Sequence, residues 1–211
     1  MAGLAGCSGG GGDGDTGGDG SDGGDGSDGS GGTRVAIAPS TGPTTLDPQN
    51  HNETTTTTYL VHFYNGLVTR DIEMQLVPDL ATDWTNPDPT TWEFSLREDV
   101  QFSNGEEFTA ETAKYNLERV SGQLNDETLP IQDLYTTIGE VEALDTHTLR
   151  VNLTEPDPLF LDNQADLQFV PMEYTQENGF DALNDNPVGT GPYELESWQR
   201  QDQMVMTARD D

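Results

Sequence analysis

Cys7 is the only cysteine of the chain, and its setting points to covalent modification. The four residues that end at Cys7 read Leu-Ala-Gly-Cys, the pattern at which prokaryotic lipoproteins are cleaved and lipidated. Small residues there admit the signal peptidase, and the thiol takes the lipid. A secretory signal also needs a charged start and an apolar stretch of roughly 7–15 residues, whereas only six residues precede Cys7. We therefore interpret residues 1–7 as the remnant of a signal peptide with lipidation at Cys7; a chance match is the alternative.

Other residue types that could do chemistry lack the spacing that chemistry requires. The histidines at positions 51, 62 and 147 share no metal-ligand spacing with one another or with the cysteine. The sequence has no pattern for a serine nucleophile, a phosphate-binding loop or a zinc protease. Among 39 acidic residues, pairs of carboxylates arise by chance and indicate no acid–base site. The sequence therefore predicts a protein that is not an enzyme and that uses no cofactor and no metal.

Two Asn-X-Thr sequons, at Asn52 and Asn152, are possible acceptors for N-glycosylation. Sequons also arise by chance in a chain rich in threonine. Asn152 falls within a predicted strand, which makes Asn52 the better acceptor. The sequence leaves the use of both open.

The charge of the chain is strongly one-sided, with 39 acidic and 8 basic residues and a net charge of −31. Nucleic-acid binding and a basic membrane-surface helix both need clustered Lys and Arg, so both are excluded. No apolar run reaches the roughly 18 residues of a membrane-spanning helix. The single lysine, Lys114, together with the excess of Asp, Glu and Thr, favours a halophilic origin, because 1 M salt screens charge repulsion beyond about 3 Å. An ordinary acidic secreted domain is the alternative.

Residues 8–32 contain only Gly, Ser, Asp and one Thr. None of these side chains can build an apolar core, so we expect a disordered tether. Taking its six aspartates from the net charge of −31 leaves −25 on the rest of the chain. That remainder holds all three tryptophans and is expected to form a folded unit with a very acidic surface.

Apolar periodicity and turn residues predict a mixture of strands and helices in the folded part. Strands are expected at 33–38, 67–69, 75–77 and 92–96, and hairpins at 138–144 with 148–153 and at 193–198 with 204–207. Helices are expected at 54–66, ending at Asn-Gly, at 109–119, capped by Thr109, and with interruptions over 158–178. Trp92, Phe94 and Leu96 alternate onto one strand face and are predicted to be core. The elements fit an α/β or an α+β fold.

A series of ordered motifs resembles the family 5 extracellular solute-binding proteins, which are the oligopeptide, dipeptide and nickel receptors of ABC importers. The resemblance covers residues 33–211. Its signature lies at Pro78 to Trp84, Trp92 to Glu98 and Phe102 to Ala110, and further motifs follow the family's order at Thr45 to Pro48, Tyr64 to Val68, Leu149 to Pro156 and Asn186 to Tyr193.

The resemblance implies an α/β, periplasmic-binding-protein-like type II (venus-flytrap) fold, in which two lobes close on a ligand. Residues 33–66 and 169–211 would be parts of the ligand-binding lobe I, and residues 67–168 would form a small extra domain. Family members are more than twice as long, so the resemblance implies that the second lobe is missing and that the sequence is a fragment. Gly189 and Gly191 are expected to allow close backbone turns.

The implied function is that of the substrate-binding component of an ABC importer. It would capture peptides or a similar small solute outside the cell and deliver them to membrane permease subunits, while a lipid at Cys7 anchors it to the outer face of the cell membrane. The loop after Pro48 would face the cleft, which makes Asn52 and Thr54 candidate ligand contacts; alternatively, Thr54 caps the following helix. A cell-surface adhesive lipoprotein with an acidic stalk and a secreted hydrolase are the other classes. The motifs do not fix the ligand.

Overall fold

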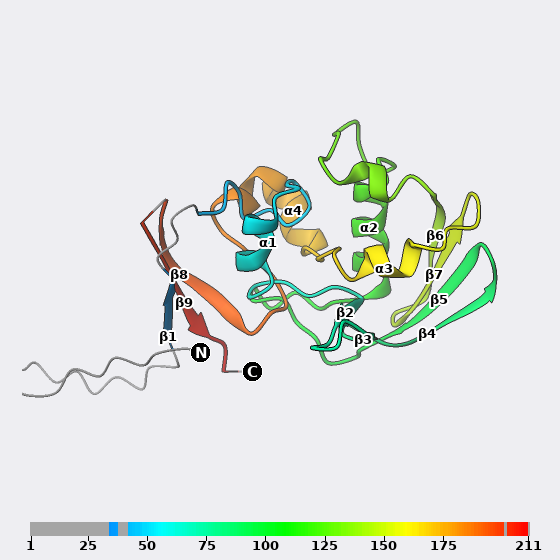
Figure 1. The fold of residues 1–211 in the computed structure, drawn as a ribbon, viewed down its shortest axis with the longest axis horizontal. Coiled ribbons are helices and arrows are strands. Elements are labelled where there is room, and N and C mark those ends of the chain that lie inside the picture. Colours follow the sequence, from blue (N-terminus) through cyan, green and yellow to red (C-terminus); the bar gives the residue numbers. More distant parts are fainter. Residues whose placement is uncertain (1–33, 38–41, 201, 211) are drawn as a thin grey trace, which may run out of the picture. The chain divides into compact units, whose positions relative to one another are not determined.

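The computed structural model describes residues 34–37, 42–200 and 202–210. The strands within these residues form three antiparallel sheets, with the orders β1-β9-β8, β2-β3 and β4-β5-β7-β6 (Figure 1). Their bounds are β1 Arg34–Ile37, β2 Val68–Arg70, β3 Leu76–Pro78, β4 Ala81–Asp88, β5 Thr91–Leu96, β6 Ile138–Asp145, β7 Thr148–Leu153, β8 Tyr193–Gln199 and β9 Gln203–Ala208. The α-helices are α1 Thr54–Leu60, α2 Ala110–Val120, α3 Phe160–Gln164 and α4 Met172–Asn178, and two 3₁₀ helices are η1 Gln132–Leu134 and η2 Phe180–Asn184.

The four-stranded sheet has its core on the face that the alternation of β5 predicts. Phe94 and Leu96 are buried on this strand, and the ring of Trp92 lies 5.6 Å from that of Phe160 on α3. Figure 1 shows α2 and α3 beside this sheet, and α2 contacts β6 and β7. The prediction that these β5 side chains form core is therefore confirmed, because the helices cover the face on which they lie.

Helix α2 begins and ends close to where the sequence predicts. The hydroxyl of Thr109 accepts a hydrogen bond from the backbone N–H of Thr112 at 3.3 Å, which is the cap that the sequence predicts. Ala113, Leu117 and Val120 are fully buried. The helix therefore presents an apolar stripe to the sheet.

Helix α1 ends at Leu60, five residues before the Asn-Gly pair that was expected to end it. The chain continues in tight turns, in which Phe63 N–H donates to Leu60 C=O at 2.9 Å. The run of β-branched threonines favours a helix only weakly, whereas Phe63 and Tyr64 are buried beyond its end. The apolar spacing therefore predicted the buried residues correctly, but the predicted length of the helix was wrong.

Strand β4 was not predicted. Its sequence, Ala-Thr-Asp-Trp-Thr-Asn-Pro-Asp, is mostly polar and exposed and contains a proline. It lies at the edge of its sheet and pairs only with β5. Proline and polar side chains are tolerated at an edge, where one row of backbone groups faces away from the sheet. The four-residue β1 and the two hairpins were predicted and are confirmed, and 158–178 is helical with an interruption, as expected.

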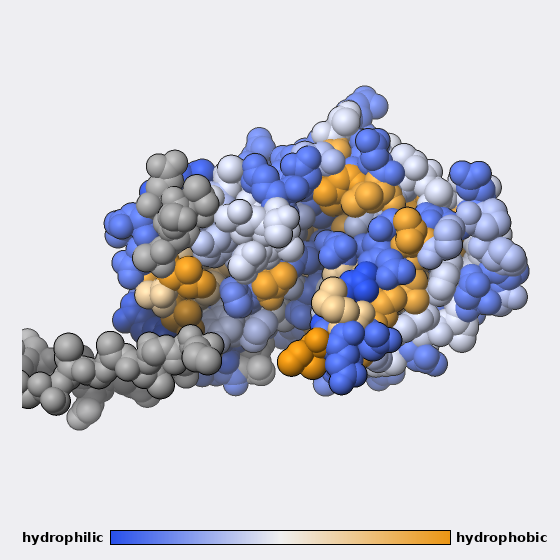
Figure 2. All heavy atoms as spheres, viewed as in Figure 1, coloured by the Kyte–Doolittle hydropathy of each residue, from blue (hydrophilic) through white to orange (hydrophobic). Residues whose placement is uncertain are grey.

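The surface on the face in Figure 2 is mostly hydrophilic, with hydrophobic residues exposed near the β2–β3 turn and beside α3. The turn carries Ile72, which is 99% exposed, and Met74, which is 65% exposed. Met74 has a positive φ of 63°. The carboxylate of Asp71 accepts hydrogen bonds from two backbone N–H groups of this turn, which fixes its shape.

Candidate functional site

The predicted ligand contacts Asn52 and Thr54 lie in an exposed loop directly before and at the start of α1. Glu53, not Thr54, occupies the cap position, with an extended backbone at φ −99° and ψ 122°. The reading of Thr54 as the helix cap is therefore wrong. The Glu53 carboxylate accepts hydrogen bonds from the hydroxyls of Thr44 and Thr56, both at 2.8 Å, and these bonds lower the pKa of Glu53.

His51, in the same loop, is buried, with only 8% of its surface exposed. Burial lowers the pKa of His51 below 6.5, although the carboxylates of Glu53 and Asp47 oppose this. Within the described residues, Nδ1 of His51 has no hydrogen-bond partner. Burial therefore favours the neutral form of this imidazole.

A buried ion pair lies immediately before the loop. Both carboxylate oxygens of Asp47 accept from the guanidinium of Arg119, at 3.1 and 2.7 Å, and the two side chains are 1% and 0% exposed. Arg119 also donates to the side-chain oxygen of Gln49 at 3.2 Å, lies 3.5 Å from a carboxylate oxygen of Glu127 and sits 3.5 Å above the ring of Phe180. The sequence motif around Asp47 was identified, but its partner was not.

A second set of buried polar groups continues from this pair. The side-chain amide of Gln49 donates to the side-chain oxygen of Asn116 at 2.6 Å and to the backbone carbonyl of Gln168 at 2.9 Å. Asn116 in turn bonds to both the N–H and the C=O of Val170, each at 2.9 Å. Gln49 and Asn116 are fully buried. The segment before the loop is thus fixed to α2 and to the chain at 168–170.

One sequence signal could have revealed this network. Thr112, Asn116 and Arg119 follow one another at spacings of four and three, so they lie on one face of a helix. All three are buried. Polar side chains on a buried helix face need partners within the protein, so the spacing predicts a polar partner segment, although not its identity.

Gly189 and Gly191 lie against the end of α1. The N–H of Gly191 donates to the carbonyl of Phe63 at 2.8 Å. A Cβ placed on Gly191 would lie 2.5 Å from the backbone carbon of Phe63 and 2.7 Å from the carbonyl oxygen of His62. Neither glycine is among those with a positive φ, which are Gly105, Gly122 and Gly179. The two glycines were expected to allow close backbone turns. The close approach of the backbone at 62–63 explains both positions, and no positive φ is involved.

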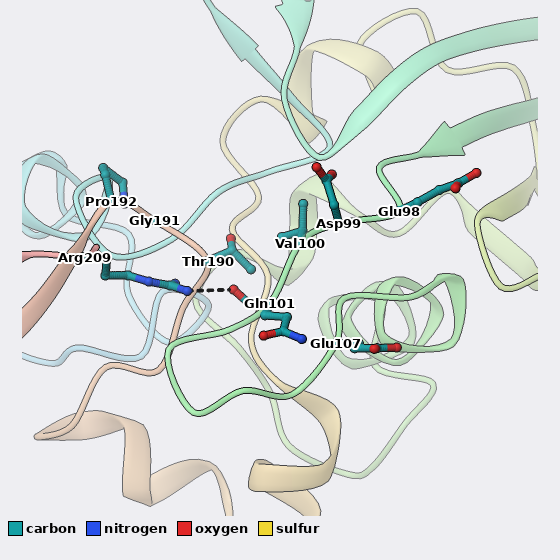
Figure 3. Close-up of a pocket in the computed structure, with 9 residues that line it drawn as sticks. All are labelled: Glu98, Asp99, Val100, Gln101, Glu107, Thr190, Gly191, Pro192 and Arg209. Carbon is teal, nitrogen blue, oxygen red and sulfur yellow. Dashed lines mark hydrogen bonds between the residues drawn. The ribbon is translucent and has the colours of Figure 1, made fainter. Parts of the chain in front are cut away.

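A hollow of about 580 Å³ lies beside these glycines (Figure 3). Arg209 reaches into it and donates to the backbone carbonyl of Gln101 at 3.2 Å and to that of Gly189 at 3.1 Å. Three acidic residues, Glu98, Asp99 and Glu107, are also among those that line the hollow. Neither Asn52 nor Thr54 lines it, so the two predicted contacts and this hollow are separate features.

The remaining predictions concern the lipidation site, the tether, metal binding, membrane-spanning helices and the sequons. Cys7 and residues 8–32 lie outside the described residues. Among the residues that are described, no group of three or more His, Cys, Asp or Glu side chains is arranged to hold a metal ion. None of the described helices is both long and apolar enough to cross a bilayer. The sequon residue Asn152 lies on β7, half-buried, and its amide donates to Glu142 at 3.0 Å.

The profile described as "Bacterial extracellular solute-binding proteins, family 5 Middle" matches residues 75–211. "Glutathione-binding protein GsiB" of Escherichia coli O1:K1 / APEC is 36% identical over 175 residues, which are 80% of this chain and 33% of that protein. The structure is similar to that of NikZ from Campylobacter jejuni in complex with Ni(L-His), with a TM-score of 0.66 and 27% identity over 74% of this chain and 31% of the other. It is also similar to OppA from Haemophilus influenzae in complex with RPPGFSPFR, with a TM-score of 0.68 and 28% identity over 76% and 35%. The chain thus spans about a third of the length of these relatives.

Proposed function

The chain belongs to the family 5 extracellular solute-binding proteins, and from this membership we propose that it is all or part of the substrate-binding component of an ABC importer. The predicted α/β fold of the periplasmic-binding-protein-like type II class is confirmed over about a third of the matched structures. The proposed role is to capture a small solute outside the cell and to deliver it to permease subunits in the membrane. In this role the protein catalyses no reaction.

The observation that carries this proposal is the 36% identity to a glutathione-binding protein over 80% of the chain. The named ligands of the relatives are glutathione, a nickel–histidine complex and a nine-residue peptide. All three present amide, amine or carboxylate groups. We therefore propose a peptide or a similar small polar solute as the ligand class. None of the relatives reported above is an adhesive or structural protein, so that alternative has no support.

Asn52 and Thr54 are the proposed ligand contacts. Two observations support them: both side chains are exposed, and the segment that precedes them is held by buried hydrogen bonds. An amide and a hydroxyl can each donate and accept, so the pair is suited to the polar backbone of an extended peptide. Their loop is exposed, yet its base is rigid.

The proposed domain organisation follows the sheets. Residues 33–66 and 169–211 would belong to lobe I, since β1 pairs with β9 across this boundary of sequence. Residues 67–168 would form the small extra domain, whose four-stranded sheet is built entirely from residues 81–153. The pair Asp47–Arg119 then joins the two parts.

Location and anchoring are also proposals. A lipid on Cys7 would hold the protein at the outer face of the cell membrane, and residues 8–32 would act as the spacer. The Gly/Asp/Ser composition next to the single cysteine supports this. The charge of −31 supports a halophilic origin and argues against a nucleic-acid partner.

Thermal unfolding of the whole gene product in molar salt tests the function. We expect glutathione, the peptide RPPGFSPFR or Ni(L-His) to raise the melting temperature in a concentration-dependent way, because a ligand of the native state stabilises it by RT ln(1 + [L]/Kd). Asn52→Ala and Thr54→Ala should weaken the response without lowering the melting temperature of the free protein, since both side chains are exposed. A response that these variants leave unchanged removes the two residues from the site.

A further inference from the structure

The buried pair Asp47–Arg119 is an unusual feature in the interior of the fold. Its side chains are 1% and 0% exposed, and the guanidinium binds both oxygens of the carboxylate. Removing two charges from water is costly, and apolar side chains of similar volume often stabilise a fold as well or better. Stability alone therefore gives a weak reason for this pair. A requirement for one defined geometry gives a stronger one.

Residues 50–54 are here called the 50–54 loop. The buried pair fixes the conformation of the chain that leads into this loop. Asp47 accepts the backbone N–H of Gln49 at 3.0 Å, and the backbone carbonyl of Asp47 accepts the N–H of Asn50 at 3.3 Å. Gln49 is held in addition by Arg119 and Asn116. These bonds hold Gln49, which directly precedes the loop, and Asn50, which is its first residue.

Within the 50–54 loop His51 is buried, but the three residues that follow it, Asn52, Glu53 and Thr54, are exposed and have little packing of their own. The orientation of the loop is thus determined at its two ends. One end is the start of α1, where Glu53 bonds to two threonine hydroxyls, and the other is the segment that Arg119 and Asn116 hold.

We propose that Arg119, through Asp47 and Gln49, is a positioning residue that holds the 50–54 loop in its ligand-binding conformation; this inference rests on the proposed function. Arg119 lies on α2, 65 to 69 residues beyond the 50–54 loop in sequence, and it is too deeply buried to touch a ligand itself. Its effect on binding is exerted through the population of the competent loop conformation. The apparent dissociation constant rises in inverse proportion to that population.

The test separates orientation from stability in the whole gene product. In the double variant Asp47→Leu/Arg119→Met, apolar groups replace both charges, so its melting temperature should lie closer to that of the wild type than the melting temperature of Arg119→Met alone, which leaves the Asp47 carboxylate buried and unpaired. We nevertheless expect Kd for the probes glutathione and RPPGFSPFR to rise about tenfold, as it would if one loop in ten were competent. Arg119→Lys keeps the charge but loses the bidentate contact with the carboxylate. It should raise Kd by a larger factor than the small fraction of unfolded protein can account for.

Hydrogen exchange of the backbone amides of residues 50–54 provides a readout that does not need a ligand. We expect faster exchange there in both variants, with unchanged exchange in β5 and β7. Glu93→Gln/Arg150→Met is the matched control, because that ion pair, at 2.7 Å, is half-exposed and lies on the sheet. It should change neither Kd nor the exchange of the loop.

A double variant with wild-type Kd and wild-type loop exchange overturns the positioning role, whatever its melting temperature. If the wild-type protein binds neither probe, the proposed function loses support, while faster loop exchange in the variants still supports the positioning role. The two failures are therefore distinguishable.

Discussion

Substitution of Gly191 by alanine adds one methyl group where three backbone atoms already stand. The added Cβ would lie 2.5 Å from the carbon and 2.8 Å from the oxygen of the Phe63 carbonyl, and 2.7 Å from the carbonyl oxygen of His62. Ordinary van der Waals contact at such a position begins at 3.4 Å. The segment at 62–63 must therefore move by about 1 Å, and no side chain can rotate to make room.

The expected cost follows from two opposing effects. Overpacking of a rigid site costs about 1–3 kcal/mol, and the clash with backbone places Gly191→Ala at the upper end. Alanine also restricts the unfolded chain, which returns about 0.4–1 kcal/mol. The net loss is about 2 kcal/mol, which corresponds to a fall of about 4–8 °C in melting temperature for a protein of this size.

Urea unfolding in molar salt measures this loss directly. Gly105→Ala is the control, because a Cβ there meets nothing within 4 Å, although φ is +86°. Its cost is therefore a matter of backbone strain alone, about 1 kcal/mol. If Gly191→Ala is as stable as the wild type, or less harmful than Gly105→Ala, close approach of the backbone does not explain the glycine.

Three further predictions concern pH, exposure and salt. Since burial lowers the pKa of His51, the unfolded state takes up a proton before the native state as pH falls. The free energy of unfolding, measured in urea, should therefore decline from pH 6.5 downward. His51→Gln should flatten that decline. Ile72→Ser, at a side chain that is 99% exposed, should change the free energy of unfolding by less than about 0.5 kcal/mol. Leu60→Ala, at a fully buried side chain, should cost about 2–5 kcal/mol. Equal effects of the two variants in urea unfolding would refute the burial of Leu60. With −25 on the residues outside 8–32, cooperative folding should need molar salt, and a cooperative far-ultraviolet circular dichroism transition in dilute buffer would disprove this.

Local patterns were sufficient for elements whose own sequence carries the signal. The alternation of Trp92, Phe94 and Leu96 predicts a half-buried strand, and Thr109 followed by the apolar stripe predicts α2. These signals lie within a dozen residues, so no distant contact is needed to interpret them. The edge strand β4 and the early end of α1 depend instead on pairing and packing with other segments, which local patterns do not contain.

The candidate site also combines residues that local patterns predict with residues that only distant contacts bring together. The exposed contacts Asn52 and Thr54 were proposed from the position of a motif, and the structure places them in an exposed loop. Arg119 was predicted only as the end of a helix. Its partner Asp47 lies 72 residues away, and the local pattern of a single sequence carries no signal for a pairing over that distance.

Equilibrium dialysis of the whole gene product in molar salt, against a pool of peptides and nickel–histidine complexes, tests the central claim most directly. Mass spectrometry then identifies the solutes that the protein retains. The account predicts saturable retention of one class of peptide or small polar solute, weakened by Asn52→Ala. A natively folded protein that retains no member of the pool above the level of a control protein would contradict its assignment as a solute-binding receptor.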